Sequence, residues 1–426
     1  MGKKEMGLEI RKRRKGKKET QEDEMERIRW AADKKEDWGR EEEIELDHRK
    51  VEAMVPRRFH KWLKVFKKVE SERMPTRKIW DHAIDLKEEF KASKVRVYPL
   101  SRNEREEVQQ FIQDHLRKGY IRSSKSPQTS PVFFVGKKNG GKCMVMDYHR
   151  LNKQMVKNNY LLPLITDLVD SMGNKKLFTK IDLRWGYNNV CIKEGDEWKA
   201  AFTTHVGSFE PVVMFFGMMN SPATFQGIIN EIIRDLINEE KVVVFVDDVL
   251  VGTDGEERHK IVAEVLKWLE ENDLYVKPEK CSWKTSKVNF LGVVMGQGKI
   301  EMEEEKVKGV LNWPVPKTVR DIRKFLELTN YYRRFIRNFA ALAKPLNMLT
   351  RKDEKWKWEE AQQKAFEQLK GIFTTRPLLI APDLDKEFRV EADASNFATG
   401  GVLSIKCEDN KWRPVVYISK SLNETE

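Results

Sequence analysis

Two adjacent aspartates interrupt a run of β-branched residues in the middle of the chain. Residues 242–246 and 249–251 are apolar segments on either side of Asp247 and Asp248. Valine favours extended structure, because its branched side chain packs well on a pleated sheet. The pattern therefore predicts a strand, an acidic turn and a second strand. Like charges between buried strands repel and raise each other's pKa, so something must neutralise the pair.

Asp182 is a third carboxylate that ends a strand-like segment, residues 177–181. Three acids brought together by folding would form an oxygen-rich site for Mg²⁺. Two such ions about 4 Å apart can drive in-line phosphoryl transfer. One would activate a 3′ hydroxyl, and the other would hold the triphosphate and stabilise the leaving oxygen. The alternative is an ordinary hairpin turn with a solvated strand end, because Asp is common in turns; either motif alone favours this alternative.

The charge balance favours a polyanionic partner. Lys and Arg number 80 against 68 Asp and Glu, which gives a net charge of +12. Nucleic acid fits this excess, and an acidic membrane surface also would. The chain has no apolar run of about 20 residues and no secretory signal, so we expect an intracellular protein of the cytoplasm or nucleus without a membrane partner. The four cysteines are scattered without paired spacing, which argues against zinc and disulfides.

Periodic patterns place helices and strands from about residue 95 onward. Ser101 and Glu104 form a capping box, and Gly119 closes the helix that they begin. A basic hairpin follows, with strands at 131–135 and 143–146 and a turn rich in glycine and lysine. Further helices are expected from Ser221 to Leu236, at 257–271 and at 318–340, with strands from Phe388.

The first 50 or so residues carry blocks of charge and few apolar positions, so we expect a solvated, partly helical extension. Its basic run at 11–18 could bind nucleic acid or direct nuclear import, but such runs are more often solvated surface.

Ordered segments from about residue 75 to 426 resemble the reverse transcriptases of gypsy-class long-terminal-repeat retrotransposons. The matching segments are WDHAIDL, VYPLS, GYIRSSKSP to SPVFFV, DYHRLN, KIDLRWGYNNV, FFGMMNSPATFQ, VVVFVDDVLV, PEKC, FLG, NYYRRFI and VEADASNFATGGVLS. The resemblance implies an α+β fold: a right-hand polymerase of fingers, palm and thumb, followed by an incomplete ribonuclease H-like α/β domain. The expected divisions are a charged extension (1–55), a linker (56–94), fingers and palm (95–300), a thumb-like helical region (301–355) and a truncated ribonuclease H-like domain (356–426).

The resemblance implies an RNA-directed DNA polymerase that transfers nucleotides from dNTPs to a primer 3′ hydroxyl with two Mg²⁺ or Mn²⁺ ions. The expected partners are an RNA or DNA template with an annealed primer, and other products of the same pol polyprotein. Protease, integrase and zinc-knuckle motifs are missing, so we expect a fragment of a polyprotein gene.

Residue by residue, the resemblance makes Asp182 and Asp247 metal ligands and Asp248 their acidic neighbour. Tyr187 falls where the family has an aromatic ring under the incoming sugar, where it would exclude a 2′ hydroxyl. Phe216 and Gly217 resemble a loop that packs on the incoming nucleotide. The alternative for Tyr187 and Phe216 is a place in the core.

Basic residues complete the implied site. Lys137 and Lys142 would reach the triphosphate as point charges, although a solvated lysine turn explains them almost equally well. Lys280 is a weaker candidate for a proton donor to pyrophosphate. Asp393 matches the first metal-binding aspartate of ribonuclease H, whose other acids would lie beyond Glu426, so RNA cleavage is not expected.

Three departures bear on activity. Relatives usually carry arginine where this chain has Cys143, His149 and Cys191. Cysteine cannot replace the planar fork with which arginine contacts a triphosphate. The second hypothesis is therefore a catalytically dead relic that still binds nucleic acid in a salt-dependent way but incorporates no nucleotide. A third, an unrelated basic scaffold, would require every matching segment to be coincidence.

Overall fold

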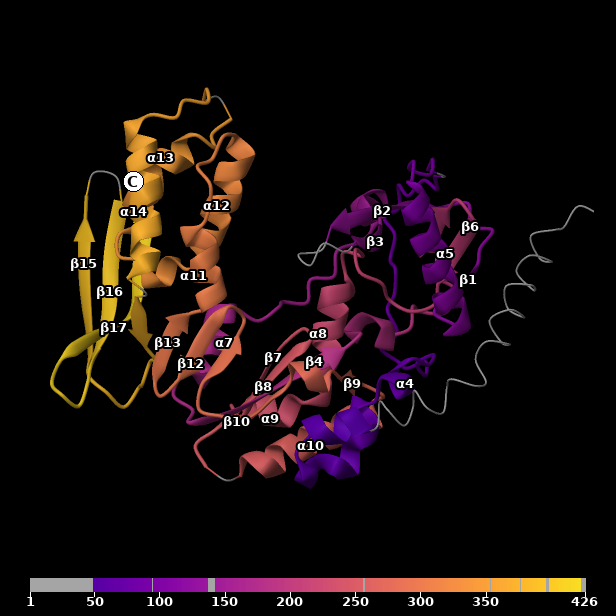
Figure 1. Cartoon of the computed structure of the whole chain (residues 1–426), viewed down its shortest axis with the longest axis horizontal. Coiled ribbons are helices and arrows are strands. Elements are labelled where there is room, and N and C mark those ends of the chain that lie inside the picture. Colours follow the sequence, from indigo (N-terminus) through magenta and orange to yellow (C-terminus); the bar gives the residue numbers. More distant parts are fainter. Residues whose placement is uncertain are drawn as a thin grey trace, which may run out of the picture. The chain divides into compact units, whose positions relative to one another are not determined.

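The computed structural model describes residues 49–422, apart from 94, 137–141, 256, 353, 376 and 396–397. The chain divides into two compact units. Figure 1 labels the helices and strands of the chain. The first unit holds the described residues up to Asn159 together with Trp185–Phe225 and Asp273–Tyr275; the second holds Tyr160–Arg184, Gln226–Asn272 and the described residues from Val276 onward. Helices and strands are mixed in the chain, which confirms the predicted α+β class.

The first unit is built on a five-stranded sheet with the order β1-β6-β5-β2-β3. The predicted hairpin is confirmed as antiparallel β2 and β3, in which Val135 lies opposite Cys143. The predicted helix is α5, and both halves of its capping box form between Ser101 and Glu104. Its strands are β1 (Ile121–Ser123), β2 (Ser130–Gly136), β3 (Lys142–Met146), β5 (Phe202–Thr204) and β6 (Gly207–Pro211), and its helices are η1 (Arg57–Phe66), α4 (Lys68–Ser71), α5 (Arg102–Arg117), α6 (His149–Gln154), η2 (Gly186–Asn189) and η3 (Glu197–Ala200).

A buried cluster holds this sheet and α5 together. Val108 and Ile112 are the apolar face of α5, and they pack with residues of the sheet such as Val132 and Phe202. Burial of such side chains stabilises a unit by roughly 25 cal/mol for each Å² of apolar surface removed from water.

The second unit contains the predicted strand, acidic turn and strand, now seen as β7 and β8 in a sheet with the order β10-β4-β8-β7. One prediction needs correction: β4 does not end before Asp182 but continues to Arg184, because its pairing with β8 extends to Asp182 and Asp248. The elements here are α7 (Ile165–Met172), β4 (Leu177–Arg184), β7 (Val242–Phe245), β8 (Asp248–Thr253), α10 (Arg258–Glu271), η4 (Pro278–Lys280) and β10 (Ser282–Thr285). Of the short strand β9 (Tyr275–Val276), which pairs with β4, only Val276 is counted in this unit.

Two predicted helices are each divided. The helix expected from Ser221 to Leu236 is α8 (Ser221–Ile232) followed by α9 (Arg234–Asn238), because buried, β-branched Ile233 leaves helical geometry with φ of −112°. The segment 318–340 consists of α12 (Val319–Tyr331), η5 (Arg333–Phe335) and the start of α13 (Phe339–Met348). Asn338 takes a left-handed conformation with φ of 55°, which stops the helix from continuing.

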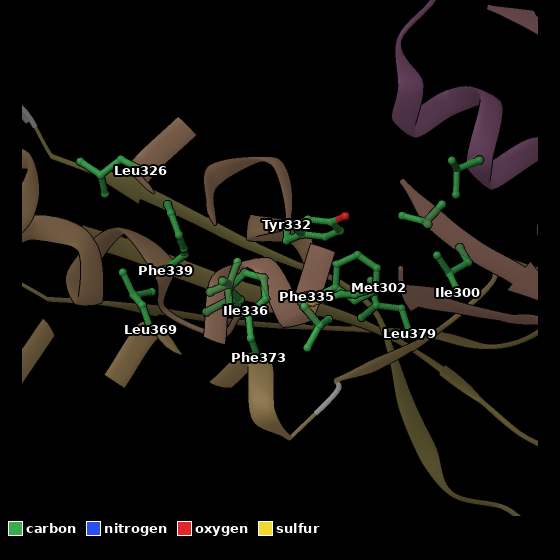
Figure 2. Packing of buried hydrophobic residues seen from close by; sticks show 14 of the residues in the cluster. Ile300, Met302, Leu326, Tyr332, Phe335, Ile336, Phe339, Leu369, Phe373 and Leu379 are labelled. Carbon is green, nitrogen blue, oxygen red and sulfur yellow. The ribbon is translucent and has the colours of Figure 1, made fainter. Parts of the chain in front are cut away.

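One hydrophobic core joins the sheet of β4 to the helices that follow it. Figure 2 shows Tyr332, Phe335 and Phe373 packed together, and the Tyr332 and Phe373 ring centroids are 5.8 Å apart. The remaining elements are β11 (Val288–Phe290), β12 (Val293–Gly296), β13 (Lys299–Met302), α11 (Glu304–Leu311), α14 (Glu360–Thr374) and β14 (Leu378–Ile380), and then the sheet of β15 (Phe388–Ala394), β16 (Ala398–Lys406) and β17 (Trp412–Ser421). Among the described residues, no helix is both long and apolar enough to cross a bilayer.

Candidate active site

Three aspartates lie near one another at one end of the β4 and β8 pair. Asp182 lies directly opposite Asp248 in the antiparallel register, so the two side chains emerge on the same face of the sheet. Asp247 is in the turn between β7 and β8, and its carbonyl accepts a 2.8 Å hydrogen bond from the amide of Leu183. Folding therefore brings together carboxylates that are far apart in the sequence.

The turn that carries Asp247 is strained, and a buried glutamine holds it. Val246 has φ of 53°, a left-handed conformation that is costly for a β-branched residue, on the order of 1–3 kcal/mol. Its amide donates a 2.7 Å hydrogen bond to Oε1 of Gln226, and Nε2 of Gln226 donates to the carbonyl of Val244 at 3.2 Å. Gln226 is fully buried. The sequence analysis missed this residue, although it ends the matching segment FFGMMNSPATFQ.

Lysine ammonium groups surround the aspartates. Nζ of Lys277 donates to Oδ1 of Asp182 at 2.9 Å, and Nζ of Lys280 lies 3.5 Å from Oδ2 of the same carboxylate. Nζ of Lys180 lies 2.9 Å from Oδ1 of Asp248. These lysines supply the positive charge that the sequence analysis expected to neutralise the acids. The sequence analysis did not identify Lys180 or Lys277 as site residues. Lys180 reaches the site through the register of β4 with β8, and Lys277 through its backbone hydrogen bond to Asp182.

Burial raises the pKa of Asp247 above its ordinary value. The ammonium group of Lys277 opposes this rise, while the charges of Asp182 and Asp248 add to it. The ionisation of Asp247 therefore depends on its burial and on the charges around it.

The donor set suits a hard divalent cation, because its ligands are all carboxylate oxygens. Oδ1 of Asp248 is buried, and the group that lies against it is the ammonium of Lys180, 2.9 Å away. Across residues 49–422, outside the gaps, no three His, Cys, Asp or Glu side chains already converge closely enough to enclose a metal ion. The carboxylates of Asp182 and Asp248 instead lie against lysines.

The aromatic candidates lie in the first unit. Tyr187 is in η2 and is 8% exposed, with its ring centroid 4.7 Å from that of Phe216 and 5.8 Å from that of Phe225. Phe216 is 60% exposed, so the alternative of a core position does not hold for it. Gly217 has φ of 101°, a conformation that favours glycine, and its carbonyl accepts a hydrogen bond from Nδ2 of Asn152.

Lys142 and Asp393 are on the surface. Lys142 is exposed at the start of β3, with Nζ 2.6 Å from Oε1 of Glu104. Lys137 falls outside the described residues. Asp393 is exposed on β15, opposite Gly400.

The three positions of departure differ in environment. Cys143 is exposed on β3. His149 is also exposed, with Nδ1 2.6 Å from Oδ1 of Asp147. Cys191 is buried, and burial raises the pKa of its thiol to about 11, so that residue belongs to the interior.

Comparison with known proteins gives consistent results. Residues 135–295 match the family described as "Reverse transcriptase (RNA-dependent DNA polymerase)", and residues 358–426 match "RNase H-like domain found in reverse transcriptase". The Tf2-3 and Tf2-7 transposon polyproteins of Schizosaccharomyces pombe are each 37% identical over 344 residues, covering 80% of this chain and 26% of theirs. The chain thus spans about a quarter of the length of these curated relatives.

Solved structures show the same fold. The foamy viral protease-reverse transcriptase dRH in complex with double-stranded DNA gives a TM-score of 0.76 at 24% identity, covering 90% of this chain and 69% of that one. The foamy viral protease-reverse transcriptase in complex with an RNA/DNA hybrid gives 0.72 at 24% identity, covering 83% and 48%. The fold is that of a polymerase with a ribonuclease H-like region.

Proposed function

The chain belongs to the reverse transcriptases of gypsy-class retrotransposon polyproteins, and on that premise we propose that it is itself an RNA-directed DNA polymerase. It would transfer nucleotides from dNTPs to the 3′ hydroxyl of a primer annealed to RNA or DNA. The observation that carries the proposal is the set of three aspartates at the end of β4 and β8. The net charge of +12 supports a nucleic-acid partner.

Asp182, Asp247 and Asp248 would hold two Mg²⁺ or Mn²⁺ ions, since reverse transcriptases depend on divalent metals. Bound there, such ions would activate the primer hydroxyl and stabilise charge on the leaving pyrophosphate. The partly buried position of the aspartates strengthens their electrostatic interactions, because screening by water is weaker there. Gln226 would keep Asp247 aimed at the site by holding the strained turn.

Other residues would bind the nucleotide. Tyr187 would lie under the sugar and exclude a 2′ hydroxyl, with Phe216 and Gly217 packing on the nucleotide. Lys142, and Lys137 five positions before it in the sequence, would contact the triphosphate. Lys142 would first have to leave Glu104, a short move for an exposed, flexible side chain.

The remaining assignments follow the same resemblance. Lys280 is the proposed proton donor to pyrophosphate, and Asp393 is a remnant of a ribonuclease H site. We propose fingers and palm at 95–300, a thumb at 301–355 and a ribonuclease H-like segment at 356–426, preceded by a charged extension (1–55) and a linker (56–94). Other products of the pol polyprotein are the proposed protein partners.

Primer extension tests the polymerase proposal. The substrate is a DNA primer on an RNA template with all four dNTPs and Mg²⁺ or Mn²⁺, and the proteins are the wild type and Asp247→Asn. We expect extension by the wild type and its loss in the variant, with equal binding of the primer-template by both. Equal extension by the two proteins would contradict the assignment of Asp247.

The alternative of a catalytically dead relic has one residue in its favour, Cys143, whose thiol cannot make the bidentate contact of arginine. The comparisons do not favour it. Extension by the wild-type chain would exclude the relic. If the wild type binds the duplex but does not extend it, recovery of extension in Cys143→Arg would assign the defect to this position.

A further inference from the structure

The carboxylates of the proposed polymerase site already have cationic partners. Asp248 pairs with the ammonium group of Lys180, and Asp182 pairs with those of Lys277 and Lys280. Asp247 is close enough to Lys277 for its charge to oppose the rise in the Asp247 pKa. Asp182 alone has lysines on both oxygens, Lys277 on Oδ1 at 2.9 Å and Lys280 on Oδ2 at 3.5 Å. A divalent ion approaching Asp182 therefore meets positive charge on both sides of its ligand.

We propose that Lys277 and Lys280 are resident counter-ions of Asp182, which a divalent cation must displace before it can bind. The chain alone would then bind divalent ions weakly, and would take them up together with the anionic triphosphate. This inference rests on the proposed function, because it concerns the same carboxylates.

The positions of the two lysines predict which of them competes more strongly with a metal ion for Asp182. The side chain of Lys277 is 24% exposed and that of Asp182 is 14% exposed, so water screens this pair weakly. The backbone amide of Lys277 also donates to the carbonyl of Asp182 at 2.9 Å, which fixes the base of the side chain beside the carboxylate. The side chain of Lys280 is 58% exposed and makes the longer contact. Lys277 should therefore be the stronger competitor.

Displacement is physically feasible because a lysine ammonium is a point charge on a flexible stem. The lysines cannot stay in place once the metal binds, because a divalent ion on Asp182 and an ammonium group in contact with the same carboxylate would repel each other across a few ångströms. A triphosphate resolves the conflict, since its oxygens can accept the displaced ammonium groups. Uptake of metal and of nucleotide should thus be cooperative.

Direct measurement of Mn²⁺ binding by electron paramagnetic resonance, without nucleotide or nucleic acid, tests this inference. The proteins are the wild type, Lys277→Met, Lys277→Arg, Lys280→Met and Asp182→Asn. The matched control is Lys287→Met, which removes a lysine paired at 3.3 Å with Glu301 elsewhere in the second unit. Thermal unfolding of each protein checks that it is folded.

We expect Lys277→Met to bind Mn²⁺ about tenfold more tightly than the wild type, since one competing charge at close range is removed. Lys280→Met should bind more tightly by a smaller factor, whereas Lys277→Arg and Lys287→Met should match the wild type. Adding a non-hydrolysable dNTP analogue should narrow the difference between the wild type and Lys277→Met.

Unchanged or weaker binding in Lys277→Met and in exposed Lys280→Met would overturn the inference. The proposed function would survive that result if Asp182→Asn still reduced Mn²⁺ binding in the presence of the dNTP analogue. If Asp182→Asn had no effect under any condition, both the inference and the proposed metal site would fail.

Discussion

Substitutions of Tyr187 can separate a role in sugar selection from a role in packing. Its ring packs in edge-type contacts with exposed Phe216 and with buried Phe225. We expect Tyr187→Val to raise the efficiency of ribonucleotide relative to deoxyribonucleotide incorporation by about tenfold or more, because the smaller side chain leaves room for a 2′ hydroxyl. Tyr187→Phe keeps the ring and should keep the discrimination.

The ratio of kcat/KM for rNTP and dNTP, measured for both Tyr187 variants, checks this prediction. If Tyr187→Val lost stability but kept the wild-type ratio, Tyr187 would be a core aromatic and nothing more.

Buried His82 and half-buried His115 should make stability depend on pH. Burial lowers the pKa of His82 and of His115 from 6.5 to about 4. In the unfolded chain these imidazoles therefore bind protons below pH 6.5, whereas in the folded chain they bind protons only near pH 4. Their contribution is fully present above pH 6.5 and is lost as the pH falls toward 4, by about 1.4 kcal/mol per pH unit for each imidazole within that interval.

Urea unfolding between pH 7 and 4 measures this slope. His115→Phe is the informative variant, since the imidazole stacks on Phe111 with ring centroids 3.7 Å apart and another ring can take its place. The free energy of unfolding of the variant should fall less steeply with acidification. An unchanged slope would show that His115 is not among the groups responsible.

The β7–β8 turn depends on Gln226 from the neighbouring helix. Gln226→Met keeps the length of the side chain but removes its two hydrogen bonds to the turn and a third to Oδ1 of Asn230, leaving the amide of Val246 without its acceptor. We expect a loss of about 1–3 kcal/mol in the free energy of unfolding, together with slower nucleotide incorporation, because the strained turn can relax.

Gln110→Met is the matched control for this prediction. It breaks an exposed hydrogen bond to Asp114, and its effect should stay within about 0.5 kcal/mol. Chemical denaturation measures both variants. Equal stability of the two would mean that the turn keeps its geometry without Gln226.

The sequence predicted the elements of this site better than their ends and their partners. Alternating and β-branched patterns located β4, β7 and β8, but no local signal shows that β4 continues through Asp182, because that depends on pairing with β8. Likewise, buried Ile233 divides a helix whose apolar stripe continues on both sides. Lys277 lies just before the matching segment PEKC and Gln226 ends the segment FFGMMNSPATFQ, but their roles arise from the tertiary fold.

At the level of the whole molecule, the compact units do not follow the order of the chain. Arg184 belongs to the second unit and Trp185 to the first, so Asp182 and Tyr187 fall in different units although only four residues separate them. In the same way, α14 packs into the core that also contains Phe325 of α12, with the Phe325 and Phe366 ring centroids 4.7 Å apart. Dividing the sequence into consecutive segments predicts neither the unit boundary after Arg184 nor the packing of α14 with α12, because both depend on tertiary contacts.

Single-turnover incorporation of one dNTP, comparing Asp182→Asn with Asp393→Asn, tests whether the aspartates at the end of β4 and β8 form the polymerase centre. Both substitutions remove one negative charge at nearly constant size, but Asp393 is exposed on β15, in a different sheet. We predict a rate at least about a hundredfold below wild type for Asp182→Asn, and a wild-type rate for Asp393→Asn. Equal rates for the two variants would contradict the account.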